Sequence, residues 1–269
     1  MLETEKRNPK TTHIDSLDTL SMVKLINEEN YNSVKAVENA LPKVAEAIDI
    51  ISDAMANGGR LIYIGAGTSG RLAVMDAAEC PPTFGVDHNT VVAIIAGGEQ
   101  AMVRAQENIE DSADSGKNDV VAIDICEKDV LVGISAAGGA AYVVSALQYA
   151  KELGCKTISL SSNDKCKIAE VSDVHIFVNT GAEVITGSTR MKAGNAQKMV
   201  LNMLSTCAMI RGGKVYENLM INLKPTNIKL KERMIGIVSD ICNTDRDNAL
   251  RLLEENDFSI RKIVDKMEK

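Results

Sequence analysis

The chain has 269 residues, of which 45% are hydrophobic and 25% charged, and its formal net charge is -7. This composition is ordinary for a soluble α/β protein, and an acidic chain without a lysine or arginine run excludes nucleic acid as a partner. No apolar stretch reaches the roughly 18 residues of a membrane span, and the charged, polar first residues are unlike a secretory signal.

The first predicted elements are helices over residues 17–57. Val37, Leu41, Val44 and Ile48 recur at the spacing of one helix face, and the glycine pair at 58–59 ends the last of these helices.

Five apolar strands alternate with helical segments along the middle of the chain. They are predicted at residues 61–65, 90–98, 129–135, 156–161 and 173–178. Strands of this kind form a parallel sheet covered on both faces. We therefore expect a doubly wound five-stranded α/β domain, whose ligands bind beyond the carboxyl ends of the strands.

A long helix is predicted next, from about residue 188 to 210, and short charged helices then follow at 228–242, 246–255 and 259–266. The change in composition after "LKPTN" divides the chain into a sheet domain with N-terminal helices, residues 1–225, and a small helical appendage, residues 226–269.

A glycine turn follows the first strand, with glycines at 65, 67 and 70 in a GxGxxG pattern. A dinucleotide site needs an acidic residue that closes the second strand, and here Glu99 lies only beyond it. Hydroxyls and a guanidinium at a helix start suit a compact phosphate monoester instead, although a plain strand–helix turn remains the alternative. The predicted ligand residues of this turn are Gly67, Thr68, Ser69, Gly70 and Arg71.

Two acidic stretches are candidates for proton transfer. Glu79 is predicted to end a helix that Pro81 and Pro82 stop. There it is either a general acid with a raised pKa or a solvated helix-end side chain. The stretch 107–116 predicts a solvated acidic loop, unless one of its carboxylates turns toward the first glycine turn. These carboxylates are Glu107, Glu110, Asp111 and Asp114.

Two further turns are candidate anion sites. Ser188, Thr189, Arg190 and Lys192 precede or begin the long helix. Basic residues oppose the dipole at a helix start, so either an anion binds there or Ser188 or Thr189 caps the helix. The second glycine turn, within residues 130–144, has no side-chain hydroxyl from position 136 to 141.

A zinc site needs clustered ligands, and the histidines and cysteines of this chain are scattered. The cysteines are Cys80, Cys126, Cys155, Cys166, Cys207 and Cys242. We therefore expect no metal, and reduced thiols in the cytoplasm.

Taken together, "RNP" at residues 7–9, "LIYIGAGTSGR", "DAAECPPTFGV" and "TGSTRMKAGNAQKMVLNMLST" resemble the N-acetylmuramic acid 6-phosphate etherases, which have the sugar-isomerase (SIS) fold. The resemblance covers most of the chain and runs more loosely into the C-terminal helices, which look like the family's ubiquitin-associated-like tail. It implies a cofactor-free cytoplasmic homodimer that cleaves the D-lactyl ether of its sugar phosphate substrate by elimination and then water addition.

The resemblance also implies roles for particular residues. The family's acid falls on Glu79, which would protonate the departing lactate oxygen, and its second glutamate falls on Glu110, which would take the C2 proton. The second glycine turn would bind the sugar phosphate through Ser135 and Gly138.

This turn departs from the family pattern of Ser, Gly, Arg, Thr and Pro, because the chain has Ala137, Gly138, Gly139, Ala140 and Ala141. Three explanations stay open: an active enzyme with a rearranged phosphate site, a weakened variant, or a non-catalytic sugar-phosphate sensor. An SIS-type isomerase is a more distant alternative, and a DNA-binding regulator is the most distant.

Overall fold

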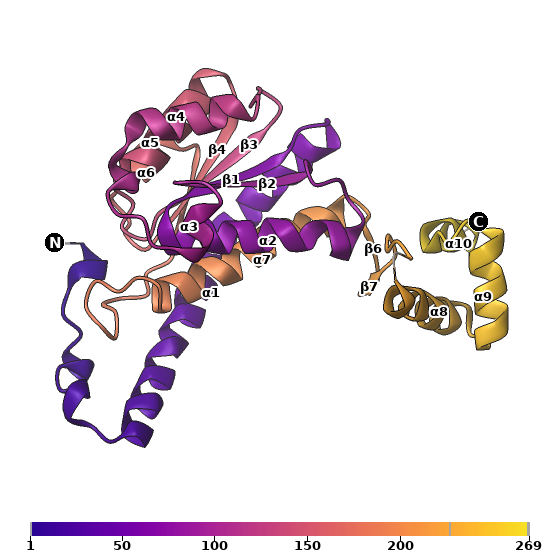
Figure 1. Cartoon of the computed structure of the whole chain (residues 1–269), viewed down its shortest axis with the longest axis horizontal. Coiled ribbons are helices and arrows are strands. Elements are labelled where there is room, and N and C mark those ends of the chain that lie inside the picture. The colour runs from indigo at the N-terminus through magenta and orange to yellow at the C-terminus, as the bar shows by residue number, and fades with distance from the viewer. Residues whose placement is uncertain (1, 226, 268–269) are drawn as a thin grey trace.

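The computed structural model describes residues 2–225 and 227–267, and its main body is a parallel sheet with helices on both faces (Figure 1). The strands are β1 (Leu61–Gly65), β2 (Val91–Ile95), β3 (Val130–Ile134), β4 (Lys156–Ser161) and β5 (Val174–Phe177). They pair in the order β2-β1-β3-β4-β5, with every neighbouring pair parallel. The predicted doubly wound five-stranded sheet is therefore confirmed.

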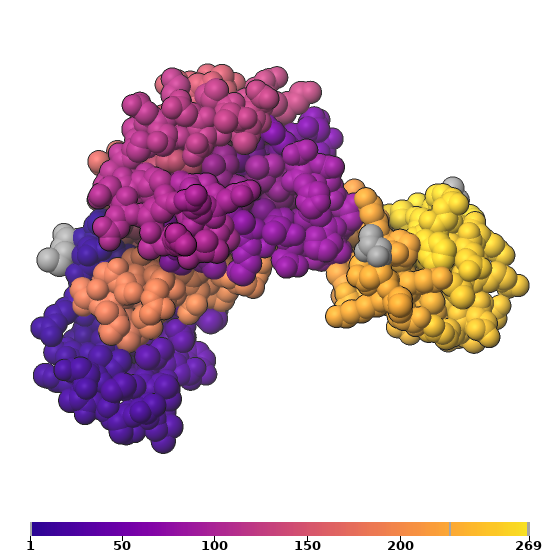
Figure 2. Space-filling view, viewed as in Figure 1, coloured from indigo at the N-terminus to yellow at the C-terminus, as the bar shows by residue number. Residues whose placement is uncertain are grey.

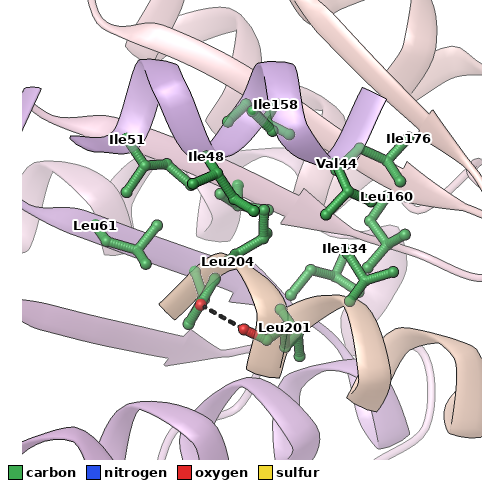
Figure 3. Close-up of a cluster of buried hydrophobic side chains, with 14 of the residues drawn as sticks. Val44, Ile48, Ile51, Leu61, Ile134, Ile158, Leu160, Ile176, Leu201 and Leu204 are labelled. Atoms are coloured by element: carbon green, nitrogen blue, oxygen red, sulfur yellow. Dashed lines mark hydrogen bonds between the residues drawn. The ribbon is translucent and has the colours of Figure 1, made fainter. Parts of the chain in front are cut away.

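One face of the sheet is covered by three long helices. These are α1 (Thr19–Ala56), α2 (Gly67–Phe84) and α7 (Lys192–Arg211). Val44 and Ile48 of α1, Leu204 of α7 and Ile158 of β4 belong to one buried cluster between these helices and the sheet (Figure 3). Because side chains alternate along a strand, Leu61 and Tyr63 of β1 face this cluster.

The other face is covered by shorter helices. They are α4 (Ala113–Ala122), α5 (Ala141–Glu152) and α6 (Lys167–Val171), whereas the short helix α3 (Gln100–Val103) contacts α2. Ile62 and Ile64 of β1 pack in a second buried cluster with Val143 and Leu147 of α5. Both faces of β1 are thus buried, which explains why its sequence is continuously apolar.

Helix α2 is longer than the sequence predicts, because the prolines at 81 and 82 lie inside it and it continues to Phe84. A proline removes an N–H group but holds a φ that a helix accepts. The helix ends at Gly85, whose φ is 65° and whose N–H donates to the carbonyl of Pro81 at 2.9 Å. The expectation that Pro81-Pro82 stops the helix is wrong, and Glu79 lies inside the helix rather than at its end.

The N-terminal residues run along the body as 3-10 turns at Glu3–Glu5, Pro9–Thr11 and Ile14–Ser16 before α1 begins. Asp18 caps α1 by accepting from the N–H of Ser21 at 3.1 Å. The first turns of α1 extend away from the sheet in Figure 1. The N-terminal helices expected from the sequence are confirmed as one 38-residue helix.

The C-terminal part forms a separate cluster beside the body (Figure 2). It consists of the hairpin strands β6 (Val215–Tyr216) and β7 (Leu219–Met220) and the helices α8 (Ile228–Cys242), α9 (Arg246–Glu255) and α10 (Ile260–Met267). Ile221 and Leu223 are buried in the same cluster as Met234 of α8. These two side chains precede residue 226, where the sequence divides the chain, and that division stays a prediction.

Candidate functional site

The candidate site is a cavity of about 300 Å³ at the carboxyl ends of β1 and β3. In the sheet, β2 pairs with one edge of β1 and β3 pairs with the other edge. The strand order therefore reverses between β1 and β3. Ligands of open α/β sheets bind at such a point. The lining residues are Glu5, Ala66, Gly67, Thr68, Ser69, Glu110, Ile134, Ser135, Ala136, Ala137, Ala140, Gly187 and Thr189.

The first wall of the cavity is the start of α2, where Gly67, Thr68 and Ser69 lie. Ala66 occupies the N-cap position and provides no side-chain hydrogen bond to the helix. The free N–H groups of this turn are therefore available to an anion. Ser69 donates its hydroxyl hydrogen to Oε1 of Gln197 at 3.0 Å, which ties the turn to α7.

Gly70 and Arg71 do not line the cavity, although the sequence predicts both as ligand residues. A Cβ at Gly70 would lie 2.6 Å from Cγ1 of Ile95, so glycine is needed there for close packing against β2. The guanidinium of Arg71 donates to the carbonyls of Met102 at 3.1 Å and Arg104 at 3.3 Å. It fixes the loop after α3 instead of reaching the cavity.

The second wall is the glycine turn between β3 and α5. Ala137 and Ala140 line the cavity, and Ala140 caps α5 without any side-chain hydrogen bond. Ser135 also lines it, and its hydroxyl oxygen accepts from the N–H of Gly138 at 3.1 Å. Gly138 itself has a φ of 76° and packs against Cys166, where a Cβ would lie 2.5 Å from Sγ. The turn therefore presents an uncapped helix start to the cavity, whereas Gly138 packs on the opposite side, against Cys166.

Of the four carboxylates in the acidic stretch, Glu110 lines the cavity. It lies on a 3-10 turn, Ile109–Asp111, which begins after Asn108 in the left-handed region at φ 62°. Glu110 and Glu107 are both exposed, but only Glu110 of the two belongs to the lining, where it shares the cavity with the start of α2. The sequence makes this loop a candidate for proton transfer only if one of its carboxylates faces the first glycine turn. Glu110 lies in the same cavity as that turn.

Glu79 is exposed on α2 and does not line the cavity. It follows Gly67 by 12 residues on the same helix, which is about 18 Å at the helical rise. Within one chain, Glu79 and Glu110 are therefore not brought together.

The third wall comes from the loop before α7, through Gly187 and Thr189. Ser188 and Arg190 lie in the same loop outside the lining, and Arg190 is exposed. The start of α7 already holds an anion, because Glu183 accepts from the N–H groups of Lys192 at 3.1 Å and Ala193 at 2.9 Å. The sequence predicts a ligand anion or a cap by Ser188 or Thr189 at this helix start, whereas the structure places a buried carboxylate of the chain itself there.

Lys192 is 1% exposed, and its Nζ lies 2.6 Å from Oε2 of Glu29 on α1. Burial alone would raise the pKa of Glu29, but hydrogen bonds from Lys192 and Asn8 outweigh it and lower this pKa. The predicted contact of Lys192 with substrate is therefore replaced by an ion pair between α1 and α7. No sequence pattern links two positions so far apart in the chain.

Glu5 is a cavity residue that the sequence analysis missed. It precedes "RNP", the stretch at residues 7–9 that carries part of the family resemblance, by two positions. With Glu110 it gives two carboxylates to the lining, and no lysine or arginine contributes to that lining within the described part of the chain. The hydrogen-bond donors that the lining offers are therefore backbone N–H groups at helix starts and hydroxyls.

Across residues 2–225 and 227–267, no three His, Cys, Asp or Glu side chains are grouped as metal ligands would be. Over the same residues, no helix combines the length and hydropathy that crossing a membrane requires.

Curated relatives match the chain over nearly its whole length. The N-acetylmuramic acid 6-phosphate etherase of Bacillus pumilus (strain SAFR-032) is 51% identical over 263 residues, which cover 98% of this chain and 87% of the relative. The enzyme of the same name from Pasteurella multocida (strain Pm70) is 50% identical over 256 residues, covering 95% and 85%. The chain belongs to the N-acetylmuramic acid 6-phosphate etherase family. The family resemblance drawn from the sequence motifs is confirmed.

Two domain models and several solved structures agree with the SIS fold of this etherase family. The model of the glucokinase regulatory protein N-terminal SIS domain matches residues 43–151, and that of the SIS domain matches residues 98–207. A phosphoheptose isomerase from Francisella tularensis is 19% identical with a TM-score of 0.56, and it covers 71% of this chain and 98% of its own. One from Neisseria gonorrhoeae is 21% identical with a TM-score of 0.54 and the same coverage. At these identities the likeness concerns the fold alone.

Proposed function

We propose that this chain is an N-acetylmuramic acid 6-phosphate etherase that releases D-lactate and N-acetylglucosamine 6-phosphate. One observation carries the proposal: the starts of α2 and α5, both without a side-chain cap, meet Glu110 in one cavity. Uncapped helix starts bind phosphate through their N–H groups and dipoles. A carboxylate beside them is available for proton transfer at the attached sugar.

The chemistry needs positioned proton-transfer groups at two carbons. Once the sugar ring opens, the aldehyde at C1 makes the C2 proton acidic, and Glu110 takes that proton. The electron pair forms the C2–C3 double bond as the C3–O bond breaks, and the lactate oxygen leaves with a proton from an acid. Water then adds across the double bond, with its oxygen on C3 and a proton returned to C2.

Backbone N–H groups and a few hydroxyls bind the phosphate in this proposal. Thr68, Ser135 and Thr189 line the cavity and carry hydroxyls, whereas the hydroxyl hydrogen of Ser69 is donated to Gln197. Hydrogen bonds to a charged group are worth about 1.5–3 kcal/mol each. Because positions 137 and 140 are alanine, the second turn offers the phosphate its backbone N–H groups and the hydroxyl of Ser135.

We propose further that the protein acts as a cytoplasmic homodimer, and that the acid is Glu79 supplied by the partner subunit. Glu79 is exposed on α2 and free to enter a second copy. A face of α1 also offers apolar side chains for dimer contacts, since exposed large hydrophobics recur on one side of that helix. They are Leu20, Val23, Tyr31, Val34 and Leu41.

The test is D-lactate release from N-acetylmuramic acid 6-phosphate by the purified protein. Glu110→Gln keeps the shape of the side chain but removes the base, so we expect release to fall by about 10²–10⁴-fold. Glu107→Gln, on the same loop but outside the cavity lining, is the matched control and should retain wild-type activity.

Two outcomes would contradict the proposal. If Glu110→Gln releases lactate as fast as Glu107→Gln does, Glu110 is not the base. If the wild-type protein binds the sugar phosphate saturably but releases no lactate, the chain is a sugar-phosphate sensor rather than an etherase.

A further inference from the structure

The N-terminal 3-10 turn, Glu3–Glu5, contributes Glu5 to the cavity wall, although it lies well before both glycine turns in the sequence. Thr4, in its centre, is 1% exposed and so is packed into the body. The backbone N–H of Glu3 donates to Oδ1 of Asn163 at 2.8 Å. This turn is therefore a fixed wall of the cavity.

Asn163 joins this turn to the second glycine turn. The side chain of Asn163 is buried, and its Nδ2 lies within hydrogen-bond distance of the carbonyls of Ala136 at 3.2 Å and Ala137 at 3.4 Å. The same Nδ2 lies 3.4 Å from Oγ1 of Thr4. One amide thus sets the position of the N-terminal turn relative to the phosphate-binding backbone.

The carboxylate of Glu5 lies where this wall meets the loop before α7. A Cβ built at Gly187 would lie 3.5 Å from Oε2 of Glu5. Over residues 2–225 and 227–267, no hydrogen bond or ion pair engages this carboxylate, whereas the neighbouring Glu3 pairs with Lys6 at 2.5 Å. Glu5 is exposed at the cavity, so its carboxylate is solvated and is available as an acceptor to a ligand.

We propose that Glu5 is a specificity-determining residue, which accepts a hydrogen bond from a hydroxyl or amide N–H of the bound amino sugar. The inference rests on the proposed function, because it takes the starts of α2 and α5 as the phosphate site. An ionised carboxylate only accepts hydrogen bonds and repels phosphate. Glu5 must then face the neutral, donor-bearing end of the ligand, and it rejects sugars that lack a donor at that position.

The test compares two probes, N-acetylglucosamine 6-phosphate and inorganic phosphate, by isothermal titration calorimetry. Glu5→Ala should weaken binding of the sugar phosphate by roughly 10- to 100-fold and should not weaken binding of inorganic phosphate. Glu5→Gln keeps an acceptor oxygen, so its affinity should lie between those of Glu5→Ala and wild type. Glu3→Gln, two positions away and outside the lining, is the matched control and should bind both probes normally.

Turnover gives a second readout. If Glu5 holds the sugar equally in the ground and transition states, Glu5→Ala raises KM and leaves kcat unchanged. Wild-type affinity of Glu5→Ala for the sugar phosphate would overturn the inference, and so would an equal loss of affinity for both probes, which would indicate a structural role.

The failures of the two proposals are distinguishable. Weaker sugar-phosphate binding by Glu5→Ala in a protein that releases no lactate would overturn the etherase proposal alone. Lactate release by wild type together with unchanged binding by Glu5→Ala would overturn the role of Glu5 alone.

Discussion

Ala137 and Ala140 line the cavity at the start of α5, and a methyl group cannot donate a hydrogen bond to a ligand there. Gly139 between them is exposed, and a Cβ built there meets no atom within 4 Å. A larger side chain at 139 therefore fits without disturbing the fold. The turn has kept its backbone and has room for side-chain donors.

The variant Ala137→Ser, Gly139→Arg, Ala140→Thr is expected to bind N-acetylglucosamine 6-phosphate more tightly. Each new hydroxyl that reaches the phosphate should improve affinity by roughly 10- to 100-fold, and titration calorimetry measures the gain. Ala78→Ser, on the exposed side of α2, is the control and should leave affinity unchanged. Unaltered affinity in the triple variant would mean that this turn does not contact the phosphate.

At the scale of elements, the two strands that carry the glycine turns are tied together at their opposite ends. Asp129, just before β3, accepts from the backbone N–H of Arg60 at 2.9 Å and from its Nη2 at 2.6 Å. It also accepts from the N–H of Cys126 at 3.0 Å. Burial alone would raise the pKa of Asp129, but these hydrogen bonds outweigh it and lower the pKa.

This lowered pKa predicts an acid-sensitive contribution to stability. A carboxyl with a lower pKa in the folded state stabilises fully above its unfolded value, about 4. That stabilisation is lost as pH falls through the folded-state pKa. Asp129→Asn should therefore lower the free energy of unfolding by about 2 kcal/mol at neutral pH.

The measurement is urea unfolding of wild type and Asp129→Asn at a series of pH values. The difference between the two proteins should shrink as pH falls below about 4. A difference that stays constant down to the lowest pH would show that ionised Asp129 is not its source. Asp87→Asn, an exposed carboxylate in the loop before β2, is the control.

The residues at the start of α7 do not by themselves reveal which group binds its free N–H groups. Thr189, Arg190 and Lys192 suggested a ligand anion, yet the N–H groups of the first turn bind Glu183. Glu183 lies in the preceding loop and is fully buried. The loop has to fold back over the helix start before this contact exists, so spacing alone does not reveal it.

At the scale of the molecule, one chain places Glu110 in the cavity and leaves Glu79 exposed on the far part of α2. The homodimer proposed above reconciles the two positions, because each site would take Glu110 from one subunit and Glu79 from its partner. Dimers with twofold symmetry would then hold two equivalent sites.

Mixing two inactive variants tests this arrangement. In a dimer of Glu79→Gln with Glu110→Gln, one site carries both substitutions and the other carries neither. Random pairing should restore about a quarter of wild-type lactate release, because half of the dimers are mixed and each has one intact site. Release that stays at the level of the single variants, in a mixture shown to exchange subunits, would place both groups in one subunit or remove Glu79 from the reaction.

Much of the sheet was predictable because its signals are local. A strand buried on both faces is continuously apolar, as at 130–134, and the structure places β3 on those residues. The family was predictable for a related reason, since long motifs such as "ECPPTFG" occur within single segments. The end of α2 was not predictable from Pro81 and Pro82 alone, because proline is compatible with helical φ and only Gly85 provides the left-handed end.

The directions of charged side chains were harder to predict, because their partners are distant in sequence. Arg71 bonds to a carbonyl 31 positions away, and Lys192 pairs with a carboxylate 163 positions away. Both side chains look like phosphate ligands in their local motifs. Arg71 instead donates to a backbone carbonyl, and Lys192 pairs with the carboxylate of Glu29. Removing a charge from water without such a partner is costly.

By itself, the sequence determined the doubly wound sheet, the family and the two glycine turns at strand ends, because apolar periodicity and motif spacing are properties of neighbouring residues. Only the tertiary structure decided which side chains meet in the cavity. It brought Glu5 and Glu110 together with both turns, and turned Arg71 and Lys192 away. These outcomes depend on contacts between distant segments, which form only when the sheet and its helices have packed.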